Sequence, residues 1–404
     1  MNLRQPQRHD PSPPGQPQPQ LPGRRDALSA GIEPPEPVEH LLALAGVRVN
    51  GPERWDVQVH DARMYRRAMR QGTLGLGESY MDGDWDCDAL DELFARLMRV
   101  DVDREVLGLT RWRWLAQVLR HRWLNLQSQT RAFKVGQHHY DAGNDMFERM
   151  LDSRLIYSCA YWEYAQDLEQ AQADKLEMIC RKLDLQPGMS LLDVGCGWGG
   201  LARWAAEKHG VSVVGITVSK EQLALAQQRV RGLPVTLRLQ DYRDVQGSFD
   251  RIVSVGMFEH VGQKNYVSYF EHMRRLLAPE GVFLLHSIGN HVTSVATDPW
   301  IERYVFPNGK LPSAREMAQA LEGRFLIEDW HNFGADYDRT LMAWWQRFDA
   351  AWPELRMRYD ARFYRMWKYY LLSCAGYFRS RQGQLWQLVL TRRERSAVYR
   401  SVRL

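Results

Sequence analysis

The stretch 191-LLDVGCGWGGLARWAAEKHGVSVVGITVS-219 places four glycines within residues 195–200, just after the short run 190-SLLDV-194, which contains the acidic Asp193. Apolar residues then recur at helical spacing over 200–210, and a second β-branched run follows at 211–218. Glycine allows a tight turn and lets backbone N–H groups approach a ligand closely. The pattern predicts a strand, a glycine turn, a helix and a second strand.

The same alternation continues along the chain. We predict further helices at 169–183, 220–231 and 264–277, and further strands at 235–240, 249–258 and 281–289. Alternating helices and strands are typical of an α/β protein with a doubly wound, mostly parallel sheet. Ligands of such sheets bind outside the carboxyl ends of the strands, where the strand order reverses. The glycine turn is therefore expected to lie against a ligand.

The glycine spacing distinguishes two kinds of nucleotide-like cofactor. GxGxGG differs from the GxGxxG of dinucleotide sites, and the second strand ends in Thr217-Val218-Ser219 without an acid for a ribose. Asp193 precedes the turn instead, which is typical of S-adenosylmethionine (SAM) methyltransferases. We therefore predict a Rossmann-like class I SAM methyltransferase fold, in which Asp193 braces the loop backbone and does not contact the cofactor.

Composition limits the class of protein. A chain of 404 residues, 45% of them apolar, can bury a large core and form a main domain with one smaller domain. A net charge of +4 is too mild for a whole-molecule nucleic-acid field. The five cysteines form no CxxC pair, and the sequence has neither an N-terminal apolar signal nor an apolar run long enough to span a membrane. We expect a cytoplasmic protein with no metal site.

Composition shifts divide the chain into four parts. Residues 1–37 are rich in Pro and Gln and predict a disordered tail, and 38–109 predict a small α+β N-terminal domain. We expect residues 135–404 to form the catalytic domain, with a helical lid insertion at about 290–378. Between them, 110–134 predicts a basic helix with several tryptophans. This helix either contacts an anionic lipid surface or packs its apolar stripe on a neighbouring domain.

Several longer motifs carry a family resemblance. They include 72-GTLGLGESYMDGDWDCD-88, 157-YSCAYW-162, 257-MFEH-260, 283-FLLHSIG-289 and 298-DPWIERYVFPNGKLPS-313. Across about residues 39–392 the chain resembles the cyclopropane-fatty-acyl-phospholipid synthase family, which is related to the mycolic acid cyclopropane synthases. The resemblance implies methylene transfer from SAM to the cis double bond of an unsaturated phospholipid acyl chain. It also implies a homodimer, bound peripherally to the inner face of the cytoplasmic membrane, with the N-terminal domain engaging lipid and no nucleic-acid partner.

This chemistry makes demands that the residues can meet. An isolated alkene is a weak nucleophile, so a dry site must align it with the sulfonium. The attack leaves a carbocation, which aromatic faces stabilise, and ring closure then needs a base. Aromatic residues are dense over 300–378, although most of them are expected to be ordinary helix-packing residues. We expect 298–306 and 337–345 to line the acyl channel.

The resemblance implies that a bicarbonate ion is the proton acceptor. The residues that match its binding set are Cys159, Glu259, His286, Ile288 and Tyr337. A thiol, an imidazole, a phenol and a backbone amide are suitable donors for such an ion. By position alone, a histidine in such a buried run is more often a satisfied core residue than a functional one.

Cys374 needs separate treatment, because this cysteine has been described in the family as a nucleophile. Methyl transfer to an alkene needs no covalent intermediate, and nothing nearby in the sequence lowers the pKa of its thiol. We predict a structural or channel-lining thiol.

The predicted cofactor site combines residues from the glycine turn with others that follow it. The set is Tyr157, Ser158, Gly195, Gly197, Gly199, Thr217, Ser219, Gln222, Tyr242 and Arg243.

Three other functions stay open. A fatty-acyl methyltransferase would stop at a methyl-branched or hydroxylated product. A nucleic-acid methyltransferase would bind phosphate through 111–134 and 392–403, although 257-MFEH-260 stands where a base-selecting loop is expected. A membrane-binding module with an inactive enzyme fold would not need the intact turn.

Overall fold

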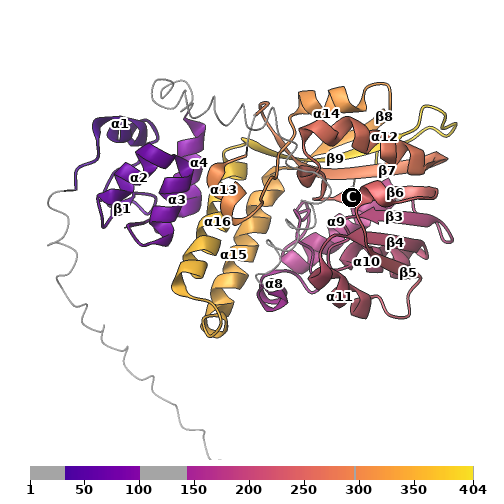
Figure 1. The fold of residues 1–404 in the computed structure, drawn as a ribbon, viewed down its shortest axis with the longest axis horizontal. Helices are drawn as coiled ribbons and strands as arrows, with labels where there is room; N and C mark the ends of the chain where they lie inside the picture. The colour runs from indigo at the N-terminus through magenta and orange to yellow at the C-terminus, as the bar shows by residue number, and fades with distance from the viewer. Residues whose placement is uncertain (1–31, 101–142, 295–296, 404) are drawn as a thin grey trace, which may run out of the picture.

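The structure is a computed structural model that describes residues 32–100, 143–294 and 297–403 (Figure 1). Its centre is a seven-stranded sheet with the order β5-β4-β3-β6-β7-β9-β8. The strands are β3 (Ser190–Val194), β4 (Ser212–Thr217), β5 (Val235–Leu239), β6 (Phe249–Val255), β7 (Leu277–Asn290), β8 (Leu326–Asn332) and β9 (Gly383–Thr391).

The first five strands are parallel, which confirms the doubly wound, mostly parallel sheet. In the sheet, β3 lies between β4 and β6. The chain runs outward from β3 through β4 to β5 on one side and then returns to β6 on the other side, so the strand order reverses at the glycine turn. The last two strands were not predicted, and β9 runs antiparallel to both β7 and β8. Residues 326–332, expected within the lid, therefore belong to the sheet.

Helices cover both faces of the sheet. Alternate residues of a strand point to opposite faces, and Leu191 packs in one apolar cluster while Leu192 packs in another. The Leu191 cluster includes residues of α9 (Leu168–Lys182) and α10 (Gly200–His209), and the Leu192 cluster includes residues of α12 (Tyr266–Leu276) and α14 (Ala314–Leu321). The remaining sheet helix, α11 (Lys220–Arg229), is N-capped by Ser219.

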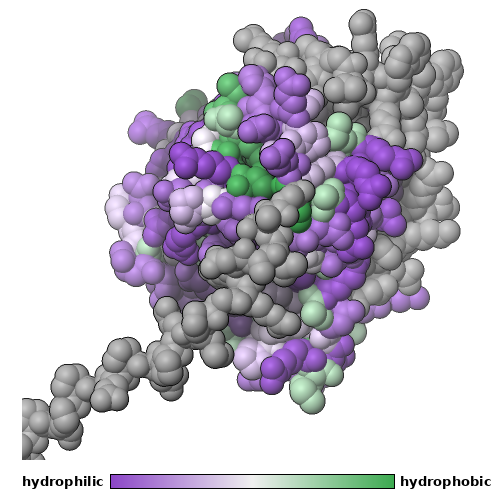
Figure 2. All heavy atoms as spheres, turned by 90° about the vertical axis from the view of Figure 1, so that its left-hand side faces the viewer, coloured by the Kyte–Doolittle hydropathy of each residue, from purple (hydrophilic) through white to green (hydrophobic). Residues whose placement is uncertain are grey.

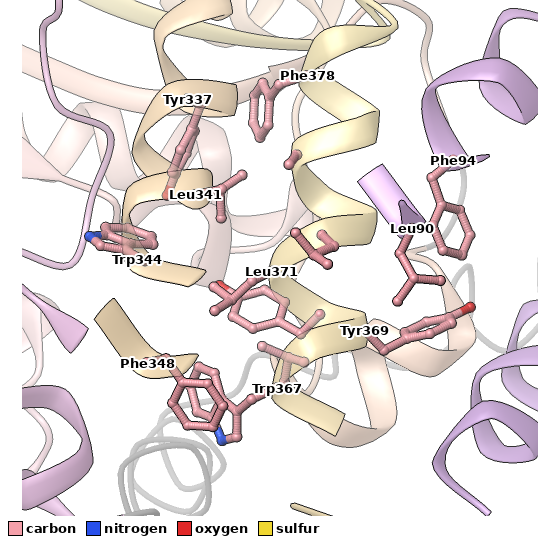
Figure 3. Packing of buried hydrophobic residues seen from close by; sticks show 14 of the residues in the cluster. Leu90, Phe94, Tyr337, Leu341, Trp344, Phe348, Trp367, Tyr369, Leu371 and Phe378 are labelled. Carbon is pink, nitrogen blue, oxygen red and sulfur yellow. The ribbon is translucent and has the colours of Figure 1, made fainter. Parts of the chain in front are cut away.

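Three further helices, α13 (Pro299–Tyr304), α15 (Ala335–Leu355) and α16 (Ala361–Arg379), build the lid together with α8 (Asn144–Met150). Figure 3 shows buried side chains of α15 and α16 facing one another, among them Phe348 and Trp367. Most lid aromatics are packing residues of this kind, as the sequence predicted.

The N-terminal domain packs directly on the lid. It consists of α1 (Glu36–Leu44), α2 (Arg63–Gln71), α3 (Thr73–Met81), α4 (Leu90–Arg99) and a two-stranded sheet of β1 (Gln58–Val59) and β2 (Trp85–Asp86). Leu90 and Phe94 of α4 lie beside Tyr369 of α16 in Figure 3. A Cβ at Gly376 would lie 2.6 Å from the Asp91 carbonyl oxygen, so only glycine permits this close helix approach.

The predicted tail and the predicted basic helix lie wholly or partly outside the described residues. Helix α1 begins at Glu36, just inside the range 1–37 predicted as a tail, and residues 1–31 lie outside the described residues. The predicted basic helix 110–134 also lies outside them. Among the described helices, none combines the length and apolarity that crossing a membrane requires.

Candidate functional site

A cavity of about 210 Å³ lies at the carboxyl ends of β3 and β4, against the glycine turn. Gly195 and Gly197 line it with φ angles of 90° and 53°, in the left-handed region that favours glycine. A Cβ at Gly195 would lie 2.8 Å from the Cβ of Met257. At these two glycines the turn thus brings backbone, and no side chain, to the cavity wall.

Eight of the ten predicted cofactor residues line this cavity. They are Tyr157, Ser158, Gly195, Gly197, Thr217, Gln222, Tyr242 and Arg243. Gly199 and Ser219 are instead the N-cap residues of α10 and α11. Gly199 has a φ of 78°, and the Ser219 hydroxyl accepts a hydrogen bond from the Gln222 N–H at 3.2 Å. Both residues therefore cap the helices that follow β3 and β4, and neither belongs to the cavity lining.

Asp193 differs from its predicted role. It lines the cavity, and its Oδ2 atom is buried without a hydrogen-bond partner among the described residues, so bracing of the loop is not what the structure shows. Burial raises the pKa of its carboxyl to about 7, and the nearby Lys175 ammonium opposes that shift. Asp193 therefore belongs to the lining of the cavity.

Two charged residues of the cavity lining were not predicted. Lys175 of α9 is 1% exposed and donates a hydrogen bond from Nζ to the Ser158 Oγ at 2.8 Å. Asp241, just before Tyr242, lines the cavity and accepts a hydrogen bond from the Arg243 N–H at 3.0 Å. The acid in 240-QDYRD-244 was visible in the sequence, whereas nothing distinguished Lys175 from other helix lysines.

A second cavity, of about 340 Å³, lies between the sheet, the lid and the N-terminal domain. We call it the acceptor cavity. It shares Tyr157, Ser158, Gly256 and His260 with the first, so the two cavities meet at these residues. Its lining is largely aromatic and apolar, and includes Phe94, Met98, Trp300, Ile301, Phe306, Tyr369, Tyr370, Tyr377 and Phe378.

The predicted channel segments contribute unequally. From 298–306, Asp298, Trp300, Ile301 and Phe306 line the acceptor cavity, but from 337–345 only Tyr337 does. Trp344 is fully buried in the lid core instead. Helix α16 supplies more of the wall than expected, because one of its faces turns toward the cavity from Tyr369 to Phe378.

Two polar side chains lie at the sheet end of the acceptor cavity. The Glu259 Oε1 accepts a hydrogen bond from the Ile288 N–H at 2.7 Å, and its Oε2 is buried without a partner among the described residues. Burial raises the pKa of Glu259 to about 7. His286 is 1% exposed, its Nε2 is likewise without a partner, and burial lowers its pKa well below the usual value.

The predicted bicarbonate set is only partly assembled at this cavity. Glu259, His286, Ile288 and Tyr337 line it, while the Cys159 Sγ lies 3.2 Å from the Ala160 carbonyl oxygen and 3.9 Å from the Thr340 hydroxyl, away from the lining. Cys374 does line it, and burial raises the pKa of its thiol to about 12. This agrees with a channel-lining thiol, since a thiolate is needed for nucleophilic attack.

Comparison with known proteins gives a consistent result. A sequence profile of the mycolic acid cyclopropane synthetase family matches residues 127–388. The cyclopropane-fatty-acyl-phospholipid synthase of Escherichia coli K12 is 55% identical over 352 residues, covering 87% of this chain and 92% of that protein. A probable fatty acid methyltransferase of Pseudomonas putida is 39% identical over 254 residues, covering 60% of this chain and 64% of that protein.

Solved structures agree. The mycolic acid cyclopropane synthase CmaA1, crystallised with S-adenosylhomocysteine (SAH) and CTAB, is 34% identical with a TM-score of 0.59, covering 64% of this chain and 97% of that one. The glycine turn, the paired cavities and these matches lead to one conclusion: the chain belongs to the mycolic acid cyclopropane synthetase family and is a SAM-dependent methyltransferase.

Proposed function

We propose that this enzyme transfers a methylene group from SAM to the cis double bond of an unsaturated phospholipid acyl chain and forms a cyclopropane ring. The observation that carries the proposal is the meeting of two cavities of different character at Tyr157, Ser158, Gly256 and His260. One has the glycine turn and polar residues such as Thr217 and Gln222, which suit a nucleotide-like cofactor, and the other is the aromatic acceptor cavity. The name of the E. coli relative, a cyclopropane-fatty-acyl-phospholipid synthase, supports the phospholipid substrate.

The cofactor supplies an activated methyl group on a sulfonium when it is bound. The residues of the chain do the rest: the aromatic lining excludes water and stabilises positive charge that develops on the acyl chain. At the junction, the Tyr157 and Tyr370 hydroxyls lie 2.9 Å apart and form a hydrogen bond, which fixes both rings beside the reacting atoms.

Ring closure also needs a proton acceptor, and we propose bicarbonate for this role. The residues fit such an ion, because Glu259 and His286 line the same cavity, and the buried Glu259 Oε2 and His286 Nε2 have no partner among the described residues and complementary hydrogen-bonding capacity. Tyr337 adds a phenol to the lining. We leave Cys159 out of this set, since its thiol is directed to Thr340. When bound, the ion supplies a small base inside a dry cavity.

The test is direct. Purified enzyme is incubated with SAM, bicarbonate and vesicles of a monounsaturated phospholipid, and the fatty esters are analysed by mass spectrometry and proton NMR. The expected product gains one CH₂, resists hydrogenation and shows cyclopropane ring protons. A methyl-branched or hydroxylated chain would instead establish the fatty-acyl methyltransferase alternative, which the Pseudomonas relative's name keeps in view.

We further propose that the N-terminal domain engages a phospholipid membrane surface, with the enzyme in the cytoplasm and bound peripherally. Helix α2 exposes Arg66, Met69 and Arg70, and Thr73, two residues after its end, lines the acceptor cavity. Figure 2 views this side of the molecule and shows a largely hydrophilic face with a limited hydrophobic group. Cationic residues beside an exposed apolar one suit an anionic lipid surface.

Co-sedimentation with anionic vesicles tests this part. Arg66→Glu/Arg70→Glu should weaken binding strongly, because each basic residue near such a surface contributes about 1 kcal/mol. The matched control is Arg231→Glu/Arg238→Glu, the same charge change in exposed residues beside and within β5 at the other end of the molecule (Figure 1). Equal binding of both variants would contradict a lipid-facing α2.

We also propose that the enzyme is a homodimer, on the basis of the family resemblance. Light scattering during gel filtration measures the mass of the assembly and tests this proposal.

A nucleic-acid partner gains no support from the C-terminal arginines. Arg392 and Arg395 donate to the carbonyls of Leu277 and Glu280, and Arg403 pairs with Asp329.

A further inference from the structure

A row of polar side chains crosses the sheet behind the acceptor cavity. The strand register pairs Gln387 of β9 with His286 of β7 on one side and with His331 of β8 on the other, so the three residues are direct neighbours. Gln387 is fully buried and His286 nearly so. Lys182, the last residue of α9, reaches this row with a side chain that is 0% exposed.

Lys182 is surrounded by acceptors. Its Nζ lies 2.8 Å from the Gln387 Oε1, 3.0 Å from the His331 Nδ1 and 3.6 Å from the Asp329 carboxylate, which Arg403 also binds. Burial lowers the pKa of Lys182 to about 7, and Asp329 opposes that shift. Burial also lowers the pKa of His331 to about 3, so its ring is neutral and can accept. At pH 6 Lys182 is therefore an ammonium that has only donors.

This arrangement orients the Gln387 amide. The amide oxygen must face the ammonium, so the amide nitrogen faces the other way, toward His286, whose Nδ1 lies 3.2 Å from it. An amide nitrogen only donates, so the Nδ1 must carry a lone pair and the proton of the neutral ring must sit on Nε2. That Nε2 belongs to the residue lining the acceptor cavity and has no other partner among the described residues.

We propose that Lys182 and Gln387 are positioning residues that hold His286 as its Nε2–H tautomer, so that the ring presents a hydrogen-bond donor, and not a base, to the acceptor cavity. The tautomer itself does not depend on the proposed function. Only the identity of the group that accepts a hydrogen bond from the His286 Nε2–H rests on it. A donor at this point suits an anionic proton acceptor, and it leaves Glu259 as the facing group that can accept a proton or a hydrogen bond.

The first experiment reads the tautomer without any turnover. Protein labelled with ¹⁵N in its histidine rings is examined by two-bond ¹H–¹⁵N correlation at pH 6, and the His286 signal is assigned by its absence in His286→Gln. Protonated and bare ring nitrogens have well-separated shifts, and the couplings distinguish Nε2 from Nδ1. We expect a neutral ring with the proton on Nε2. A proton on Nδ1, or on both nitrogens, overturns the inference.

The second experiment changes the orienting group at constant volume. In Gln387→Glu a carboxylate accepts from Lys182 and also requires an N–H from His286, so the Nδ1 should become protonated. Turnover should fall roughly 10- to 100-fold with the KM for SAM unchanged. A bare Nδ1 in this variant would overturn the proposal. Gln384→Glu is the matched control on the same strand, because Gln384 bonds Asn332 and Trp386 instead.

A third variant tests Lys182 itself. Lys182→Met keeps an unbranched side chain but removes the ammonium, so the Gln387 amide can rotate and both His286 tautomers should appear. A single unchanged Nε2–H signal would remove Lys182 from the proposal. Because these outcomes are read from spectra, they stand even if the enzyme makes a product other than a cyclopropane.

Discussion

The ammonium of Lys175 donates a hydrogen bond to the hydroxyl oxygen of Ser158 at 2.8 Å, with both residues buried. Ser158 lines both cavities, whereas Lys175 lines only the cofactor cavity. Burial lowers the pKa of Lys175 to about 8, and Asp152 and Asp193 help to keep it charged. One helix lysine thus fixes a residue at the junction where the cofactor and acceptor must meet.

Lys175→Met should therefore weaken cofactor binding. Loss of a buried hydrogen bond from a charged group costs about 1.5–3 kcal/mol, so the Kd for SAH should rise roughly tenfold or more. Isothermal calorimetry measures it. Lys208→Met, the same change in an exposed residue of α10, is the control and should bind normally. Unchanged affinity in Lys175→Met would show that Ser158 needs no such support.

Glu259 predicts a pH dependence of turnover. Because burial raises its pKa to about 7, the carboxyl is mostly protonated at pH 6 and mostly ionised at pH 8. If the ionised form accepts the proton or a hydrogen bond, turnover at constant bicarbonate should rise over this interval. Glu259→Gln should lose the rise and about 10²-fold or more of the rate, while SAH binding stays normal.

The control for that variant is Glu271→Gln, which alters an ion pair with Arg324 at the surface and should keep the profile. Full turnover of Glu259→Gln with normal cofactor binding would remove Glu259 from the proton-transfer step.

Asp193 predicts a pH dependence of stability. Its folded pKa of about 7 is higher than the unfolded value, so the folded state binds the extra proton and stability falls as pH rises from about 4 to 7. Asp193→Asn removes this loss. Its free energy of unfolding at pH 7 should be higher than that of the parent by on the order of 3 kcal/mol, with little difference at pH 4.

Asp250→Asn provides a control of opposite sign in the same sheet. The Ser190 N–H and hydroxyl both donate to Asp250 at 2.8 Å and hold its pKa below the usual value. Its contribution is present above the unfolded pKa and is lost as pH falls, so this variant should be less stable than the parent at pH 7. Denaturant unfolding at several pH values, without cofactor, measures both. Equal pH profiles for Asp193→Asn and the parent would contradict the raised pKa.

Cys374 should be dispensable. With its thiol pKa raised to about 12 by burial, it carries almost no thiolate at neutral pH. Cys374→Ala should keep turnover within about threefold, with any loss coming from altered packing of the acyl chain. Cys87→Ala, a buried cysteine of the N-terminal domain, is the control for loss of a thiol elsewhere. A loss of several orders of magnitude for Cys374→Ala alone would restore the nucleophile hypothesis.

The sequence predicted the parts of the fold that depend on neighbouring residues. Strands β3 to β7 and the helices between them follow from local periodicity, and the turn at 195–200 follows from glycine alone. The strands β8 and β9 were missed for a physical reason. Residues 326–332 form a partly exposed edge strand. Its partner residues in 383–391 are 54 to 65 positions away in the sequence, so no local pattern specifies the pairing.

The candidate site divides in the same way. Glu259, His286 and the glycine turn could be found in the sequence because they lie at strand ends or within recognisable motifs. Lys175 and Gln387 could not, because a lysine within a helix and a glutamine within a strand acquire a function only through their partners. Cys159 matched the motif, yet folding directs its thiol to Thr340.

By itself, the sequence determined that a parallel sheet would carry a glycine turn for a SAM-type cofactor, because these features depend on residues close together in the chain. Only the tertiary structure decided where the cofactor and acceptor cavities meet, and which side chains surround the ring of His286. Those depend on Lys175, Lys182 and Gln387, which reach the site from different elements. Hydrogen bonds between distant segments are fixed by packing, and no local pattern records them.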